Sequence, residues 1–168
     1  MDRRQFLTAA VAAGTLLALA GCGFHLRGSN GEADLPFKTM LVNFPDTSPL
    51  GAELKRNIRA NGTAIVTDPK LADAIFEMQS ESRDKVILSL NSQGRVREYT
   101  LYYKLRFRVK DNQDKELLAP VDIVLKRDIS FNESQVLAKE AEEGLLYRDM
   151  QSDMVQQILR RLVALKPH

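Results

Sequence analysis

The chain contains one cysteine, Cys22, within the stretch "LALAGCGFHLRG" that runs from Leu17 to Gly28. A thiol that has lost its proton is a strong nucleophile and forms thioethers and disulfides. No second cysteine is present in the sequence, so a disulfide within the chain is excluded. Cys22 is therefore either a buried free thiol or a point of covalent attachment, and the residues around it favour attachment.

An uncharged segment and then small residues precede this cysteine. Arg3 and Arg4 form a short basic head, and residues 6–20 contain no charged side chain. Such a segment is typical of a signal-peptide core and is too short for a membrane span, which needs about 20 apolar residues. The letters "LAGC" that end at the cysteine resemble the lipobox of bacterial lipoproteins. We therefore expect residues 1–21 to be a lipoprotein signal peptide that is removed.

The resemblance to a lipobox implies a specific modification of Cys22. Its sulfur would form a thioether to a diacylglycerol, the preceding peptide bond would be cut, and the new amine would be acylated. Several acyl chains hold a protein at a membrane, whereas one does so only marginally. Gly23 stands where aspartate would retain such a lipoprotein at the inner membrane. We therefore expect N-acyl and S-diacylglycerol groups on Cys22, and anchoring on the periplasmic side of the outer membrane.

The export route has two interpretations. The letters "RRQFL", residues 3–7, resemble the twin-arginine export motif. However, Asp2 precedes the arginine pair where Ser or Thr is usual, and no lysine follows Leu7. An ordinary Sec-type signal fits the same residues, so the sequence leaves both routes open.

The remaining chain has the length of one domain. Removing residues 1–21 leaves 147 of the 168 residues, which is enough to bury a hydrophobic core. Its formal charge is +1, because the removed segment holds two arginines and one aspartate. This balance argues against nucleic-acid binding, which normally requires a strongly basic domain. We expect a lipidated lead and tether over residues 22–38 and a single domain over residues 39–168.

The first half of this domain predicts a strand followed by a helix. Residues 39–44, "TMLVNF", are a compact apolar strand. Ser48 and Pro49 are typical of an N-cap and a first helical position. An Asn-Gly pair at 61–62 supplies a C-terminal stop. Apolar residues recur between them at helical spacing, at Leu50, Leu54 and Ile58. Residues 63–66 can form a further short strand.

The second half predicts a three-stranded meander and a long helix. Strand-like stretches occupy residues 74–90, 99–110 and 121–131. The turns between them are at residues 91–94 and 111–116. In the middle strand apolar and polar residues alternate strictly, which indicates one buried face. The last helix covers Glu133 to Leu165, and Gly144 leaves open whether this helix is continuous or has a break or kink there. Both apolar helical stripes need a sheet to cover them, so we expect an α+β fold with both helices on one face.

Residues suited to catalysis are scarce. The two histidines are His25, beside the expected lipid anchor, and His168, the last residue. The sequence has no glycine-rich phosphate loop after a strand and no Cys/His spacing for a metal. The acidic cluster of the last helix, at Glu140, Glu142 and Glu143, is expected to be solvent-exposed, and it does not indicate a glycan hydrolase. We expect a protein that is not an enzyme and that binds no metal or cofactor apart from its lipid.

One face of the alternating strand is cationic. Its members are Lys104, Arg106, Arg108 and Lys110. Lys126 lies on the expected antiparallel neighbour of this strand, and Arg95 and Arg97 come just before the strand. One interpretation is the solvent face of a two-layer sheet, where charges discourage edge-to-edge aggregation. The other is a surface for phosphate groups, which arginine binds through its bidentate fork. For a lipid-anchored periplasmic domain, the abundant candidate anion is the phosphorylated lipid A of lipopolysaccharide (LPS).

The motif "GCGFHLRG" after the lipobox resembles the start of the mature chain in the LptE (RlpB) family of LPS-assembly lipoproteins. Later motifs follow in the family's order, namely "TMLVNF", "PLGAELKRNIRANG", "REYTL", and "VLAKEAE" with "ILRRL". The resemblance covers about residues 22–163. It implies a two-layer sandwich in which two helices pack on one face of a mostly antiparallel four-stranded sheet.

The resemblance also implies a role. Members of the family form a one-to-one complex with the outer-membrane β-barrel that inserts LPS, an LptD-like protein. They plug its lumen, aid its assembly and bind LPS during transport to the cell surface. The implied function is therefore a non-catalytic subunit of the LPS translocon. The alternative is a lipoprotein chaperone or pilotin for another outer-membrane assembly.

Candidate binding residues follow from the family pattern and from the cationic strand. A lysine implicated in LPS binding in the family's "LAK" motif matches Lys139. A second implicated position, an arginine in the family, is Ser92 in this chain. The LPS-binding candidates are Lys139, Arg95, Arg97, Arg106 and Arg108. The barrel-contact candidates are Phe24, His25 and Arg27, whose other interpretation is a strand-like lead that pins the anchored end onto the domain.

Overall fold

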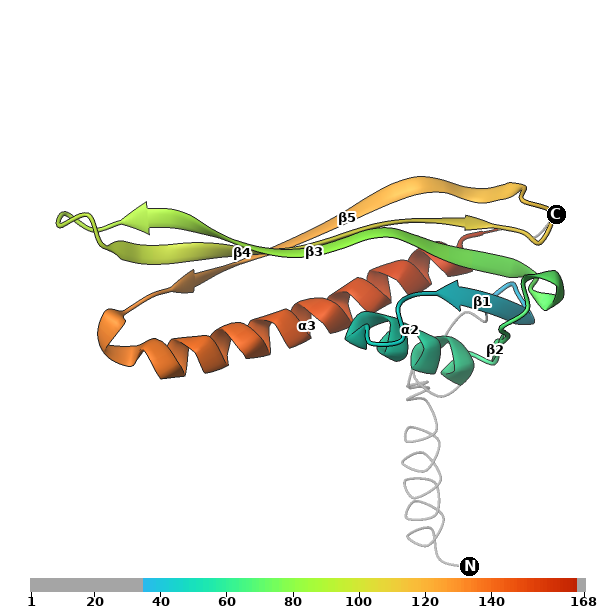
Figure 1. The fold of residues 1–168 in the computed structure, drawn as a ribbon, viewed down its shortest axis with the longest axis horizontal. Coiled ribbons are helices and arrows are strands. Elements are labelled where there is room, and N and C mark those ends of the chain that lie inside the picture. Colours follow the sequence, from blue (N-terminus) through green and yellow to red (C-terminus); the bar gives the residue numbers. More distant parts are fainter. Residues whose placement is uncertain (1–34, 166–168) are drawn as a thin grey trace, which may run out of the picture. The chain divides into compact units, whose positions relative to one another are not determined.

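The computed structural model describes residues 35–165, which form a mixed five-stranded sheet with two helices on one face (Figure 1). The strands lie in the order β2-β1-β3-β4-β5. The elements are β1 (Thr39–Asn43), α2 (Pro49–Ala60), β2 (Ala64–Ile65), β3 (Ala74–Leu90), β4 (Val96–Lys110), β5 (Glu116–Ser130) and α3 (Val136–Val163), with 3₁₀ turns at Pro69–Leu71 and Glu133–Gln135. The predicted α+β fold with both helices on one face is confirmed.

The sheet corrects the expectation of four mostly antiparallel strands. It has a fifth strand, the short β2, and β1 runs parallel to both of its neighbours, with Thr39 opposite Ala64 and Met40 opposite Ala74. The reason is the crossover through α2, which returns the chain to the start of β1 and so makes the next strand parallel. The remaining strands, β3, β4 and β5, pair antiparallel through tight turns, as expected.

Helix α2 begins and ends where the sequence predicts. The Ser48 hydroxyl accepts a hydrogen bond of 3.1 Å from the Gly51 amide, and Pro49 is the first helical residue. After Asn61, Gly62 adopts a φ of +81°, a left-handed conformation that glycine takes without steric cost. The apolar stripe of the helix is fully buried at Leu50, Leu54 and Ile58.

Strand β4 confirms the alternation of the sequence. Its inner face, the one toward the helices, buries Leu101, Tyr103, Leu105, Phe107 and Val109. The outer face carries the cationic side chains. Strand β5 pairs antiparallel with β4, and Lys126 of β5 lies opposite Tyr102. Lys126 is therefore on the strand next to β4, as the sequence predicts. The core of the domain therefore lies between one face of this sheet and the two helices.

A β-bulge between Met78 and Ser80 divides β3 into two parts. Before the bulge, the inner face carries apolar side chains such as Phe76, which is fully buried. After it, Glu81 lies opposite Leu105 and the inner positions become polar. A bulge re-aims the side chains of the strand that contains it. The polar residues within residues 74–90 thus do not end the strand. They mark the point where the packing of its inner face changes.

These polar side chains join the sheet to both helices. The Tyr103 hydroxyl donates a 2.6 Å hydrogen bond to Glu81 Oε1 and accepts one of 3.2 Å from Arg83 Nη2. Arg83 also donates to Gln151 of α3, which in turn donates to Glu53 of α2. Burial raises the pKa of the Tyr103 phenol above its ordinary value, so this hydroxyl keeps its proton.

Helix α3 is continuous over 28 residues, which answers the question that Gly144 left open in the sequence. Its two halves are packed differently. All of its buried residues lie in the second half: Met150, Met154, Val155, Ile158, Leu159 and Leu162. Residues 136–149 include no buried side chain.

The first half of α3 is held to the edge of β3 by polar contacts. Lys85 Nζ lies 2.5 Å from Glu143 Oε2, and the Tyr147 hydroxyl donates a 3.0 Å hydrogen bond to the carbonyl oxygen of Asp84. Helices in folded proteins are stabilised mainly by burying an apolar face. This half of α3 is therefore anchored less firmly than the half that covers the core.

The packed domain includes residues that precede β1. Leu35 and Phe37 are 7% and 4% exposed and belong to the core cluster. Both residues fall within the stretch that was expected to be a lead and tether, residues 22–38. Their burial places the last part of that segment against the domain.

Candidate functional site

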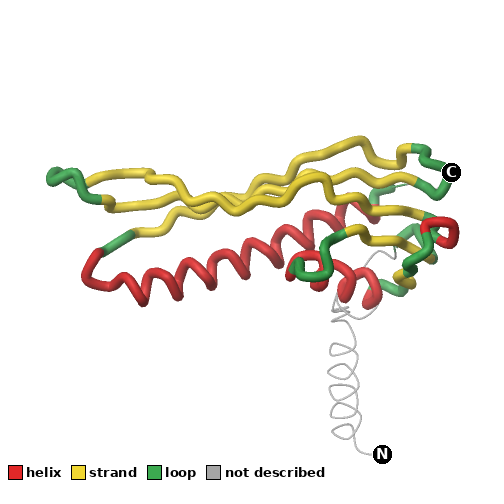
Figure 2. Tube along the Cα trace, in the orientation of Figure 1, coloured by secondary structure: helices red, strands yellow, loops and turns green. Residues whose placement is uncertain are grey.

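We call the end of the sheet that holds the β3–β4 turn, residues 91–95, the distal end. There β4 begins, β5 ends and the chain turns into α3 (Figure 2). The Phe131 amide donates a 2.8 Å hydrogen bond to the carbonyl oxygen of Arg97, and Glu98 lies opposite Ser130. The fold thereby brings three predicted binding residues to one end of the sheet: Arg95, Arg97 and Lys139.

A hollow of about 410 Å³ lies between the β3–β4 turn and the segment after β5. Arg95, Arg97, Phe131 and Ser134 are among the residues that line it. Arg95 Nη1 lies 3.2 Å from Glu133 Oε2, and both side chains are more than half exposed, so this pair is weak. Among residues 35–165 no ion pair involves Arg97, which is exposed. The hollow therefore offers one uncommitted and one weakly paired guanidinium.

Lys139 lies in the first turn of α3 and is largely covered. Its Nζ donates hydrogen bonds of 2.9 Å to the Ser130 hydroxyl and 2.8 Å to Glu142 Oε2. The side chain is 17% exposed, and that of Glu142 is 47% exposed. An anion that approached Lys139 would compete with a carboxylate that is itself free to move into water.

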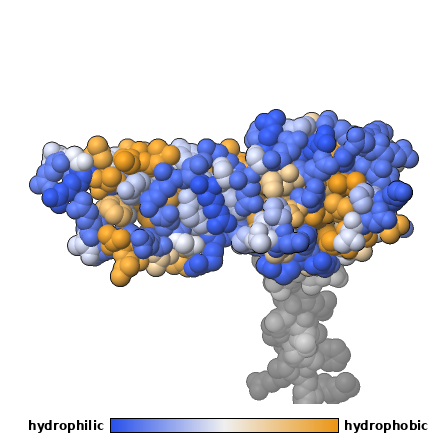
Figure 3. All heavy atoms as spheres, viewed as in Figure 1, coloured by the Kyte–Doolittle hydropathy of each residue, from blue (hydrophilic) through white to orange (hydrophobic). Residues whose placement is uncertain are grey.

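The distal end also exposes aliphatic side chains, which the sequence analysis did not single out (Figure 3). We call the following four residues of β3 the distal apolar surface: Val86 (51% exposed), Ile87 (53%), Leu88 (52%) and Leu90 (55%). The pairing of β1 with β3 stops at Glu77, so the later part of β3 is an edge of the sheet. The signal in the sequence was the run "VILSL", whose aliphatic residues do not alternate with charged ones.

The cations of the outer face of β4 are placed differently. Each has a carboxylate partner from a neighbouring element: Lys104 with Asp84 (2.9 Å), Arg106 with Asp122 (3.3 Å), Arg108 with Glu77 (2.7 Å) and Lys110 with Glu77 (2.7 Å) and Asp114 (2.6 Å). The outer face is thus a mosaic of opposite charges. Arg108 has a close and largely covered partner in Glu77, whereas the pair of Arg106 with Asp122 is about as exposed as that of Arg95 with Glu133. Neither Arg106 nor Arg108 is part of the cluster at the distal end.

The pairs around Glu77 are the tightest part of this mosaic. The hydrogen bond from Lys110, followed by that from Arg108, holds the pKa of Glu77 below its ordinary value. The Glu77 carboxylate in turn raises the pKa of Arg108. Hydrogen bonds to Asp114 and then Glu77 raise the pKa of Lys110. These groups all stay charged at neutral pH.

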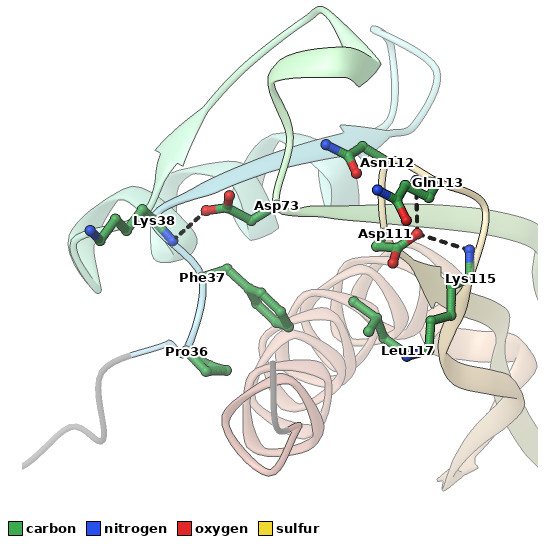
Figure 4. A pocket seen from close by; sticks show the side chains of 9 residues that line it. All are labelled: Pro36, Phe37, Lys38, Asp73, Asp111, Asn112, Gln113, Lys115 and Leu117. Atoms are coloured by element: carbon green, nitrogen blue, oxygen red, sulfur yellow. Dashed lines mark hydrogen bonds between the residues drawn. The ribbon is translucent and has the colours of Figure 1, made fainter. Parts of the chain in front are cut away.

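A hollow of about 580 Å³ at the opposite end of the sheet contains carboxylates, but they have structural partners (Figure 4). Asp73 accepts a 2.9 Å hydrogen bond from the Lys38 amide, which fixes the start of β1. Asp111 accepts from the amides of Gln113 and Lys115 at 2.8 Å each, which closes the β4–β5 turn. Within residues 35–165 no cluster of His, Cys, Asp or Glu is suited to hold a metal ion.

Four predicted site residues lie outside the described residues: Cys22, Phe24, His25 and Arg27. In the described part, no helix combines the length and the apolar composition needed to cross a bilayer.

Comparison with known proteins gives a consistent result. The family model LptE, described as lipopolysaccharide-assembly, matches residues 37–162. The LPS-assembly lipoprotein LptE of Pectobacterium atrosepticum is 27% identical over 152 residues, which cover 89% of this chain and 81% of that protein. The LPS-assembly lipoprotein LptE of Yersinia enterocolitica is 28% identical over 150 residues, which cover 88% of this chain and 71% of that protein.

Solved structures agree with the fold. An uncharacterized lipoprotein B from Nitrosomonas europaea, solved by NMR, has a TM-score of 0.73 at 40% identity, covering 84% of this chain and 91% of its own. The crystal structure of the rare lipoprotein B from Shewanella oneidensis has a TM-score of 0.67 at 26% identity, covering 75% of this chain and 94% of its own.

The family model spans both helices and all five strands, so the match extends over the whole described domain and not over one motif. A role in LPS assembly agrees with the expectation that the protein is not an enzyme. The chain belongs to the LptE family of lipopolysaccharide-assembly lipoproteins.

Proposed function

We propose that this lipoprotein is a non-catalytic subunit of the outer-membrane LPS translocon. It is anchored on the periplasmic side of the outer membrane by acyl groups on Cys22. It forms a one-to-one complex with the LptD-like β-barrel that inserts LPS, plugs the lumen of the barrel and aids its assembly. It also binds LPS in transit. Membership of the family supports the role in assembly, and the cluster of cations at the distal end is the observation that carries the binding role.

LPS binding is supported by the chemistry of the distal end. The lipid A part of LPS carries phosphate groups, and arginine binds phosphate through two parallel N–H···O bonds. Arg97 has no competing carboxylate among the described residues, and Arg95 is only weakly paired. Lys139 starts α3 at the same end and adds a third positive charge. A phosphate in the hollow that Arg95 and Arg97 line would replace weak exposed contacts by charge-assisted hydrogen bonds.

The plug role is supported by the outer face of the sheet. The lumen of an outer-membrane barrel is polar. The outer face presents charges that are already matched, for example Arg106 with Asp122 and Lys104 with Asp84. Burying unpaired charges at an interface is costly, whereas paired ones can be covered by a polar wall at lower cost. Phe24, His25 and Arg27, close to the anchor, are proposed to contact the barrel as well.

The partner is tested by purifying the tagged full-length lipoprotein from outer membranes and identifying what accompanies it. The proposal requires a single large β-barrel in equal molar amount. A secretin ring in its place would support the alternative function of a pilotin. Recovery of the lipoprotein alone under mild detergent conditions would contradict both functions.

The anchor is tested by the intact mass of the same preparation. We expect a mature chain that starts at Cys22 and carries a diacylglycerol and an N-acyl group. Cys22→Ala should release the protein into the soluble periplasmic fraction or leave its signal peptide uncut. An unmodified sulfur in wild-type protein would overturn this part of the proposal.

A further inference from the structure

We propose that the distal apolar surface binds the acyl chains of the LPS molecule whose phosphates are held by Arg95, Arg97 and Lys139. This inference rests on the proposed LPS binding and adds a hydrocarbon subsite to it. The distal apolar surface consists of Val86, Ile87, Leu88 and Leu90 of β3.

The exposure of this surface calls for a ligand. Each of its four side chains is more than half exposed, although together they form a nearly continuous aliphatic run. An exposed aliphatic run on an edge strand is a site of aggregation unless something covers it. Covering it is favourable, because each Å² of apolar surface removed from water contributes about 25 cal/mol.

The geometry of the strand favours a ligand with more than one chain. Successive side chains of a strand point to opposite faces, so Val86 and Ile87 lie on different faces of β3. Beyond Glu77 no strand of the described chain pairs with the free edge of β3, so both faces can be reached around that edge. A lipid with several acyl chains can place chains on both faces of the strand and leave its main-chain edge in water. A lipid with one chain covers only one face.

The cations identify the head group of this ligand. In the β3–β4 register Ser89 lies opposite Glu98 and Leu90 lies opposite Val96, with Arg97 between the two β4 residues. Neighbouring strands are about 4.8 Å apart, so the backbone of Arg97 lies on the strand directly beside Ser89 and Leu90. Hydrocarbon next to uncommitted positive charge is complementary to an anionic amphiphile. The acylated, phosphorylated lipid A of LPS has this chemistry.

A strand from a partner protein is the competing occupant. It would pair with the free main-chain groups of β3 and cover the same aliphatic side chains. It would have no use for Arg95 and Arg97, which line the hollow at the same end of the sheet. We therefore favour the lipid and treat a protein strand as an outcome of the test.

The test is photo-crosslinking in intact cells that make LPS, with the full-length lipoprotein. A photoreactive phenylalanine analogue is placed singly at Ser134 in the hollow, at Leu88 in the distal apolar surface, and at Leu71. Leu71 is the control, because it is 65% exposed but lies in the 3₁₀ turn at the opposite end of the sheet. We expect LPS adducts from Ser134 and Leu88 and none from Leu71.

The outcomes separate the inference from the function on which it rests. An LPS adduct from Ser134 without one from Leu88 overturns the hydrocarbon subsite and leaves LPS binding in place. If neither position gives an LPS adduct, both the hydrocarbon subsite and LPS binding at the distal end are overturned. An adduct between Leu88 and a protein, with none to LPS, identifies the surface as a contact for a partner strand and overturns the inference.

A second measurement uses the probe at Ser134 as a readout. Leu88→Ser combined with Leu90→Ser should reduce the yield of its LPS adduct roughly tenfold, because two large apolar contacts are lost. Leu71→Ser is the matched control and should leave the yield unchanged. An unchanged yield in the double variant would contradict acyl-chain binding at this surface. Because all these side chains are exposed, the substitutions leave the core intact.

Discussion

The ammonium group of Lys139 lies 2.9 Å from the hydroxyl oxygen of Ser130. This hydrogen bond ties the first turn of α3 to the last residue of β5. Only a short segment separates the two in the sequence, but the contact sets where the helix starts relative to the sheet. It thereby places a positive charge at the same end of the sheet as the hollow that Arg95 and Arg97 line.

We expect Arg97→Glu combined with Lys139→Glu to weaken LPS binding by the full-length lipoprotein by tenfold or more. The physical reason is that a hydrogen bond to a charged group contributes about 1.5–3 kcal/mol, and the reversed charge repels phosphate. Equilibrium binding to purified LPS measures the effect. The affinity of the wild type should also fall as salt rises.

The matched control is Arg106→Glu combined with Arg108→Glu, which changes the net charge by the same amount. Both arginines already have carboxylate partners on the outer face, so we expect a much smaller loss of LPS affinity. If the control loses as much affinity as the distal variant, the phosphate site lies on the outer face and the distal assignment is wrong.

Gly144→Ala should raise the free energy of unfolding by about 1 kcal/mol, because alanine is the better helix former. Gly144 lies inside the continuous α3, and an added Cβ would meet only Arg148 Nη1 at 3.8 Å. Denaturant unfolding followed by circular dichroism measures the change. A loss of stability would show that the glycine serves a purpose in α3 that its surroundings do not reveal.

Gly51→Ala should do the opposite and lower the free energy of unfolding by about 1–3 kcal/mol, as overpacking typically does. A Cβ on Gly51 would lie 2.5 Å from Phe44 Cβ. Phe44 cannot easily move, because it is buried and its ring stacks on that of Phe76 at 5.5 Å. The same unfolding assay compares the two glycine variants directly, and equal effects would contradict this account of the packing.

Tyr103→Phe should cost about 1–2 kcal/mol of stability, because it removes a buried hydroxyl that joins Glu81 and Arg83. Tyr102→Phe is the control, since among residues 35–165 its hydroxyl has no hydrogen-bond partner and its ring faces outward. Thermal unfolding of both variants is the measurement. Equal, small changes would show that the polar network does not hold α3 to the sheet.

Glu77→Gln should lower stability at neutral pH and lose this effect in acid. Lys110 and Arg108 hold the pKa of Glu77 below its ordinary value of 4.5. A lowered pKa gives stability that is fully present above the ordinary value and is lost as pH falls through the value in the folded protein. Unfolding free energies are compared at neutral pH and well below 4.5. Glu140→Gln, at an exposed position with no ion pair in the described chain, should show no such dependence.

The sequence alone predicted the elements whose signals are local. Strict alternation from Tyr99 to Lys110 can be satisfied only by a strand with one buried face. Ser48 and Pro49 predicted the start of α2 because an N-cap hydroxyl and a fixed φ act within one turn. The Asn-Gly stop and the two turns of the meander are equally local, and all of them lie where they were expected.

Gly144 shows what a local argument could not decide. A glycine inside a helix weakens it, but α3 is fixed further along by a row of buried side chains from Met150 to Leu162. Lys85 and Ser130 also hold the first half of the helix from the sheet. These contacts come from residues outside the helix, so no propensity calculation on the helix contains them.

The chemistry at Cys22, the elements and their inner faces were thus predicted from neighbours in the chain. The tertiary structure decided the rest, because ion pairs and sheet order depend on which distant segments meet. In the folded protein β1 lies parallel between β2 and β3, and Arg106 forms an ion pair with Asp122. The tertiary structure also left Arg97 without a carboxylate partner in the described domain, beside an uncovered aliphatic edge. Charge counted along a sequence cannot separate a neutralised cation from a free one, because neutralisation requires a partner that the fold brings from another strand.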